Sequence, residues 1–151
     1  MQINNFRGKI LAVNVSANPI KFMRYAHLIF GVVVFITFLV TGKFMRWDFP
    51  DKDVIPQDFR LLMRSRHIYI LLSSLIHIVL GVYLQIHAEI WRKITQVFAS
   101  AVLIAAAILF VWAFVYETYW AQHFSNISRY ALYATLAGVS LHLFGGFKAK
   151  K

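Results

Sequence analysis

Residues 67 to 88 read HIYILLSSLIHIVLGVYLQIHA, a run that contains no Asp, Glu, Lys or Arg. At a rise of about 1.5 Å per residue, a helix of this length crosses the hydrocarbon layer of a membrane, which is about 30 Å thick. Three further runs lack the same four residue types, at 25–42, 94–116 and 130–147. The sequence therefore predicts an all-α fold, an integral membrane four-helix bundle.

Composition supports a membrane protein with one domain. Hydrophobic residues make up 60% of the 151 residues, and the mean hydropathy is +0.61, whereas a soluble domain is about 45–50% apolar. The polar segments between the runs are short, so we expect residues 1–151 to form a single transmembrane domain. Cysteine is absent, which excludes disulfides, thiolate metal ligands and iron–sulfur clusters.

The formal net charge of +10 is distributed unevenly along the chain. An even number of spans puts both ends of the chain on one side of the membrane. That side carries nine basic residues (Lys and Arg) and one acidic residue. The other side carries seven basic and five acidic residues. Because basic residues favour the cytoplasmic side, we expect up-down topology with both termini cytoplasmic, in a bacterial inner membrane. The charge then contacts anionic lipid of the bilayer, and nucleic acid is not an expected partner.

The longest loop between the expected spans ends in RLLMRSRH, residues 60–67. Arg60, Arg64 and His67 are four and three residues apart, so a helix would place them on one face. One interpretation is contact with lipid headgroups and capping of the second helix. The other is an anion clamp for a propionate, a phosphate or a quinone headgroup.

Five histidines lie in the expected spans, two of them at the ends of the second span. The other three, His27, His77 and His142, lie deeper, and a glycine follows each of them after four residues. An ionisable group in a span is a candidate functional residue, because its polar nitrogens need a partner. The helical rise puts His27 and His142 near the cytoplasmic end of their spans, and His77 about 15–17 Å deep, near the middle. We therefore expect His27 and His142 to meet on neighbouring helices. His77 is expected to be structural, bonded between helices.

Two imidazoles at one depth suggest a site for haem b. His27 and His142 would be the iron ligands. Gly31 and Gly146 would leave room for the flat macrocycle, and Arg24 at the membrane face would pair with the haem propionates. A closed zinc site and a di-iron site are disfavoured, because no carboxylate lies within the expected spans.

Several short motifs resemble those of the bacterial cytochrome b561-type membrane cytochromes. They are RYAHLIFG at 24–31, TGKFM at 41–45, RSRH at 64–67 and a histidine late in the fourth helix. The resemblance covers roughly residues 22–147. It implies four helices that hold b-type haem and take electrons from quinol, with His27, His67 and His142 as the positions that match haem ligands.

Three functions remain open at this point. The chain could bind haem and transfer electrons, or serve as the haem-carrying membrane anchor of an oxidoreductase. It could instead be a non-catalytic accessory, assembly or scaffolding subunit of a membrane complex. A third interpretation is a proton-coupled or small-solute carrier that uses His77 as a relay. The expected partners are the lipid bilayer, quinone, and other membrane subunits or a second copy of the chain.

Overall fold

The computed structural model describes residues 19–51, 54–85, 89–121, 123 and 125–146. All regular secondary structure in these residues is helical, which confirms the prediction of an all-α fold with four helices. The two ends of the chain, whose cytoplasmic location was predicted, and the last residues of two expected spans lie outside the described residues. The helices are α1 (Pro19–Asp48), α2 (Gln57–Tyr83), α3 (Ile90–Val115), the short π-helix η1 (Tyr116–Ala121) that follows α3 directly, and α4 (Asn126–Gly146).

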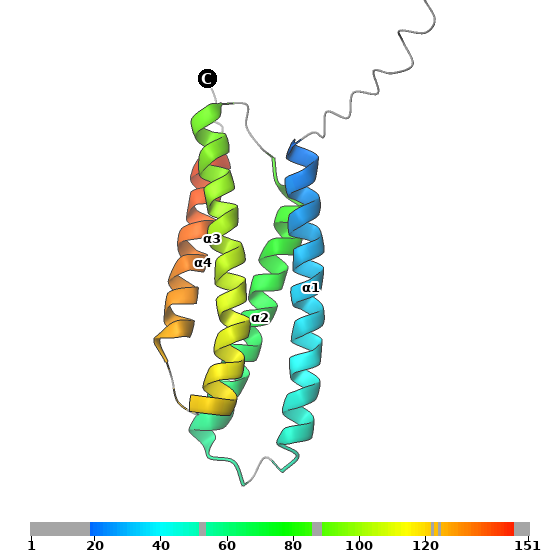
Figure 1. Cartoon of the computed structure of the whole chain (residues 1–151), viewed down its shortest axis with the longest axis vertical. Coiled ribbons are helices and arrows are strands. Elements are labelled where there is room, and N and C mark those ends of the chain that lie inside the picture. Colours follow the sequence, from blue (N-terminus) through cyan, green and yellow to red (C-terminus); the bar gives the residue numbers. More distant parts are fainter. Residues whose placement is uncertain (1–18, 52–53, 86–88, 122, 124, 147–151) are drawn as a thin grey trace, which may run out of the picture.

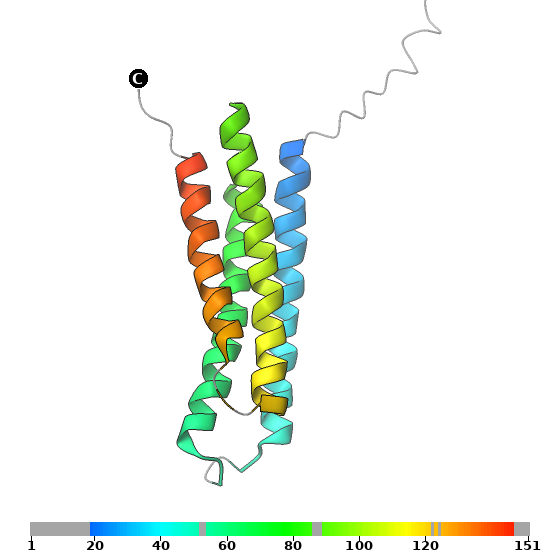
Figure 2. The same cartoon turned by 60° about the vertical axis from the view of Figure 1, so that its left-hand side comes forward.

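The four helices alternate in direction, as Figure 1 shows. Helix α1 packs along α2, α3 packs along α4, and the two hairpins meet mainly through α2 and α3. Helices α1 and α4 lie on opposite sides of the bundle in both views (Figures 1 and 2). The expectation that α1 and α4 are direct neighbours is therefore wrong, because each outer helix packs on its own hairpin partner.

Three helical segments of the described chain are long and apolar enough to cross a membrane: 21–48, 57–83 and 90–121. Helix α4 does not reach the same hydropathy, because Asn126, Ser128 and Arg129 occupy its first turn. The fourth span therefore stays a prediction. Large apolar side chains such as Ile29, Leu72 and Ile108 are exposed on the outside of the bundle, a surface that suits lipid better than water.

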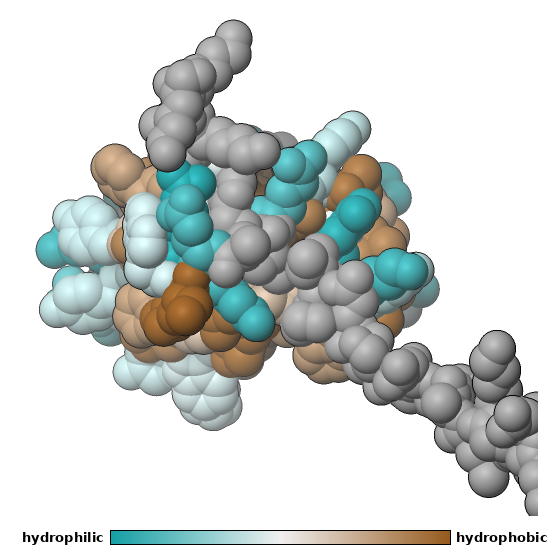
Figure 3. All heavy atoms as spheres, turned by 90° about the horizontal axis from the view of Figure 1, so that it is seen from above, coloured by the Kyte–Doolittle hydropathy of each residue, from teal (hydrophilic) through white to brown (hydrophobic). Residues whose placement is uncertain are grey.

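Figure 3 shows the end of the bundle where α1 begins and α4 ends. Hydrophilic side chains gather there over the helix ends, and hydrophobic ones lie around them. Lys21, Arg24 and Lys93 are exposed and basic. This is the face that the sequence assigns to the cytoplasm.

Helix α2 is shifted along the sequence relative to the expected span. It begins at Gln57, ahead of the apolar run, and ends at Tyr83 rather than at residue 88. A helix can continue beyond its apolar run, because long charged side chains such as Arg60 keep their charged ends in water. The first charged residue therefore does not mark where the helix begins. As a consequence, His77 lies fewer than two turns from the end of α2 rather than near its middle.

Glycines bring α1 and α2 into close contact beside the histidines. A Cβ atom added to Gly81 would lie 2.7 Å from the Cα atom of Leu28. A Cβ atom added to Gly31 would lie 2.8 Å from the backbone nitrogen of Ile78. Gly31 therefore serves helix packing, as small residues do in membrane bundles, and α2 occupies the space beside it that was predicted for a macrocycle.

Candidate functional site

Side chains from all four helices converge near the end of the bundle where α1 begins. His27 of α1, His77 of α2 and His142 of α4 are all buried, and Ser100 of α3 lies among them. We call these four residues the histidine cluster. Since the imidazole of His27 stacks on that of His77 with ring centroids 5.0 Å apart, the three histidines lie at one level rather than two.

A continuous chain of hydrogen bonds runs through the cluster. The Nδ1 atoms of His27 and His77 are 2.8 Å apart, and Nε2 of His27 lies 2.8 Å from the Ser100 hydroxyl. Nε2 of His142 lies 3.2 Å from the same hydroxyl. The prediction that His77 bonds between helices is confirmed, and its partner is the histidine that had been assigned to haem.

The Ser100 hydroxyl sets the possible tautomers of the cluster. It donates its one proton to the carbonyl of Gln96, over 2.9 Å, and a hydroxyl that has done so can only accept from other groups. Both neighbouring Nε2 atoms then carry hydrogen. In that state the Nδ1 atom of His142 holds a free lone pair. In the other neutral tautomer Nδ1 carries the hydrogen and donates, and Nε2 accepts from a Ser100 hydroxyl that has turned away from Gln96.

Two nitrogens of the cluster are buried without a hydrogen-bond partner: Nδ1 of His142 and Nε2 of His77. Of these two residues, only His142 also lines a cavity. A buried polar atom without a partner costs about 1–3 kcal/mol. The Nδ1 atom of His142 is therefore the point in the cluster where a ligand atom would gain most.

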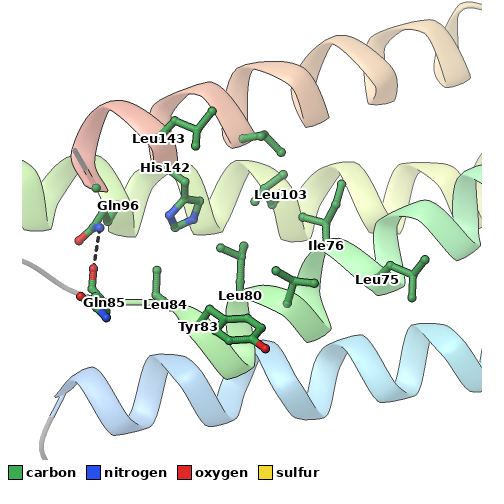
Figure 4. A pocket seen from close by; sticks show the side chains of 13 residues that line it. Leu75, Ile76, Leu80, Tyr83, Leu84, Gln85, Gln96, Leu103, His142 and Leu143 are labelled. Atoms are coloured by element: carbon green, nitrogen blue, oxygen red, sulfur yellow. Dashed lines mark hydrogen bonds between the residues drawn. The ribbon is translucent and has the colours of Figure 1, made fainter.

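A cavity of about 530 Å³ lies beside His142 between α2, α3 and α4. We call it the His142 cavity. Figure 4 shows the imidazole extending from α4 towards the side chains of α2, with Gln85 and Gln96 bonded across one end. The rest of the wall is almost entirely apolar. The lining residues are Leu75, Ile76, Val79, Leu80, Tyr83, Leu84, Gln85, Gln96, Leu103, Val139, His142, Leu143 and Gly146.

The proposed pair of haem ligands does not fit this arrangement. A bis-histidine haem has one imidazole nitrogen on each side of a flat macrocycle. Here the Nε2 atoms of His27 and His142 both bond the hydroxyl of Ser100, so that hydroxyl lies between the two nitrogens that would bind the iron. Among the described residues no three His, Cys, Asp or Glu side chains are arranged to hold a metal ion.

The other residues assigned to haem have different surroundings. Arg24 donates to the carbonyls of Gly81 and Val82 and so caps the end of α2, rather than facing a propionate. His67 lies near the opposite end of the bundle, where Nδ1 is 3.1 Å from the Thr41 hydroxyl and the ring stacks on a phenylalanine. Of the two glycines, only Gly146 is open: no atom lies within 4 Å of an added Cβ, and it lines the His142 cavity.

The protein has a second polar cluster, which the sequence does not predict. Arg66 and Glu117 form a buried ion pair at the opposite end of the bundle, 3% and 0% exposed. The Glu117 carboxylate also accepts from the hydroxyls of Ser125 and Ser128. The sequence placed Glu117 in a loop because it follows the apolar run, but α3 continues through it as η1. An acid directly after an apolar run is the signal that was available.

Ser100 and Gln96 were also missed. They stand four residues apart in the third apolar run, a spacing that puts them on one helix face, and both are buried. No family model, curated protein or solved structure matches the chain.

Proposed function

We propose that the protein is an integral membrane protein that binds a quinone-type lipophile in the His142 cavity. The observation that carries the proposal is the buried Nδ1 atom of His142, which has no partner and belongs to a side chain that lines a large apolar cavity. A ligand that combines a hydrogen-bonding ring oxygen with an apolar body would satisfy both features. The proposal includes four spans in a bacterial inner membrane with both termini cytoplasmic, supported by the three apolar helices and the basic end.

The size and wall of the cavity support a ligand of this class. Its volume, about 530 Å³, falls within the range of roughly 300–1,000 Å³ that small-molecule sites occupy. Leucine and valine side chains from α2 and α4 would contact a prenyl tail. A ligand that fills such a space from the lipid phase requires no path through water.

The tautomers of the histidine cluster suit both redox forms of a quinone. With a free lone pair, Nδ1 of His142 accepts a hydrogen bond from a quinol hydroxyl. With a proton on Nδ1, it donates to a quinone carbonyl. The two states are the two neutral tautomers of His142, and the Ser100 hydroxyl fits either one by accepting from Nε2 or donating to it. His27 extends the chain of hydrogen bonds to His77. We therefore infer that His142 offers the bound headgroup a hydrogen-bond acceptor in one tautomer and a donor in the other.

Ligand binding by the purified protein in phosphatidylcholine nanodiscs tests this proposal. Short-chain ubiquinone and menaquinone analogues should bind saturably in calorimetric titrations. Replacing His142 by Leu should weaken binding about tenfold, the value of one hydrogen bond. Ser140→Ala is the matched control, since Ser140 lies on the exposed side of α4 and should leave binding unchanged. Equal affinity in the wild type and in His142→Leu would reject the site.

A second candidate has one observation in its favour. The histidine cluster joins side chains from all four helices, which is what a non-catalytic subunit needs to hold its bundle together. Absence of any saturable quinone binding would support this function.

The haem prediction is tested separately by a dithionite-reduced minus oxidised spectrum. A low-spin haem signal that is lost in His27→Ala and His142→Ala, and kept in His77→Ala, would replace the quinone proposal. We expect no such signal, since Ser100 occupies the junction of the two nitrogens.

A further inference from the structure

A second large cavity lies at the opposite end of the bundle, where α1 ends and α2 begins. Its volume is about 570 Å³, and the described residues that line it include three arginines and no acid. Arg46 belongs to the last turn of α1, and Arg60 and Arg64 are one helical turn apart on α2. We call it the arginine cavity. His67, which the sequence grouped with Arg60 and Arg64, does not line it.

The three guanidinium groups have no partner of opposite charge in the part of the chain that the structure describes. Neither of the ion pairs found there involves them. Asp48, the acid nearest to Arg46 in the sequence, accepts a hydrogen bond from the Tyr119 hydroxyl over 2.9 Å. Three like charges around one space repel each other. An anion placed among them would remove that repulsion.

Phosphate is the anion that matches this lining. A guanidinium group offers two parallel N–H donors, which fit two oxygens of a phosphate group. The remaining wall is apolar and includes Met45, Phe49, Ile55 and Met63. A small inorganic anion would leave that surface unused, whereas a phosphate ester with an organic body would cover it.

The position of the cavity indicates where such a ligand comes from. Nearby on α1, Trp47 is exposed and Lys43 lies over its ring at 4.3 Å, an arrangement typical of the membrane–water interface. We propose that the arginine cavity binds the phosphate group of a phosphate ester, carried either by a phospholipid headgroup or by a water-soluble ester. This site is independent of the quinone proposal.

Two binding measurements on the full chain distinguish the sources. Native mass spectrometry compares retention of phosphatidylglycerol and phosphatidylcholine, and calorimetry titrates glycerol 3-phosphate. Preferential retention of phosphatidylglycerol identifies a lipid, and saturable binding of glycerol 3-phosphate identifies a soluble ester. Either result supports the site if Arg60→Gln/Arg64→Gln weakens it about tenfold or more.

The matched control is Lys43→Gln/Arg129→Gln, which removes the same charge from exposed side chains that do not line the cavity. It should leave binding within about twofold, since neither side chain lines the arginine cavity. Equal losses in the two double variants, or no binding of either probe by the wild type, would overturn the proposal. If the arginine variant fails to fold, Arg46→Gln is measured in its place and should reduce binding while the control does not.

Discussion

The histidine cluster and the Arg66–Glu117 pair are both buried polar groups in an apolar bundle, but their bonding differs. Both carboxylate oxygens of Glu117 have partners, supplied by Arg66, Ser125 and Ser128. In the histidine cluster, Nδ1 of His142 has none. The ion pair is charged and its carboxylate oxygens are all hydrogen-bonded, whereas the histidine cluster keeps a nitrogen without a hydrogen-bond partner.

The surroundings differ in the same way. A cavity of about 270 Å³ borders Arg66 and Ser128, but Glu117 does not line it and is fully buried. The His142 cavity has about 530 Å³ and is lined by the residue whose bonding is incomplete. A buried polar group whose hydrogen bonds are all made within the protein holds helices together. One that lacks a hydrogen-bond partner beside a cavity can bond to a ligand instead. This comparison assigns stability to the ion pair and ligand binding to the histidine cluster.

The largest stability effect should come from breaking the ion pair. Glu117→Gln leaves Arg66 buried without a counter-charge, and such a loss costs about 3–5 kcal/mol. Unfolding in detergent micelles measures it. The double variant Arg66→Met/Glu117→Leu should recover most of the loss, because it removes both charges. A Glu117→Gln protein as stable as the wild type would show that the pair is not a structural element.

A smaller effect is expected where α1 and α2 touch. The Cβ atom of Gly81→Ala would lie 2.7 Å from backbone atoms of Leu28, so the helices must separate, at about 1–3 kcal/mol. Gly146→Ala is the control, since its Cβ meets nothing within 4 Å. The same unfolding assay compares the two variants, and equal stability would contradict the close packing.

The smallest of the three stability effects should follow loss of His77. His77→Ala removes the bond to His27 but leaves Ser100 and His142 in place. We predict a loss of about 1–2 kcal/mol, the range for an interhelical bond in lipid, and quinone affinity close to that of the wild type. A loss of affinity as large as that of His142→Leu would place the ligand at the other end of the cluster.

The sequence was sufficient for the number and kind of the helices, because runs free of charge mark them directly. It was not sufficient to predict the end of α2. The residues directly before and after Tyr83 are both apolar, so the sequence does not change character where the helix ends. That error moved His77 to the wrong depth and separated it from His27. Pairing of α1 with α2 depends on contacts at Gly31 and Gly81, which short motifs do not specify.

The polar partners were harder to predict than the histidines. Serine is common in membrane helices, so the sequence alone does not distinguish Ser100 from other serines. Its role follows from the packing of three helices that place their imidazoles beside it. Glu117 was assigned to a loop by its charge, although a buried arginine on another helix compensates that charge. Such partners are set by packing between segments that are far apart in the chain.

Nitrogen-15 NMR of the imidazole rings tests most directly whether His142 is the ligand-binding group. The protein has six histidines, and labelling them reports the bonding of each ring nitrogen. On addition of saturating short-chain ubiquinone, the Nδ1 signal of His142 should shift, and this change should be absent in His142→Leu. A spectrum that does not change, or a shift that persists in His142→Leu, would contradict the assignment of ligand binding to the histidine cluster.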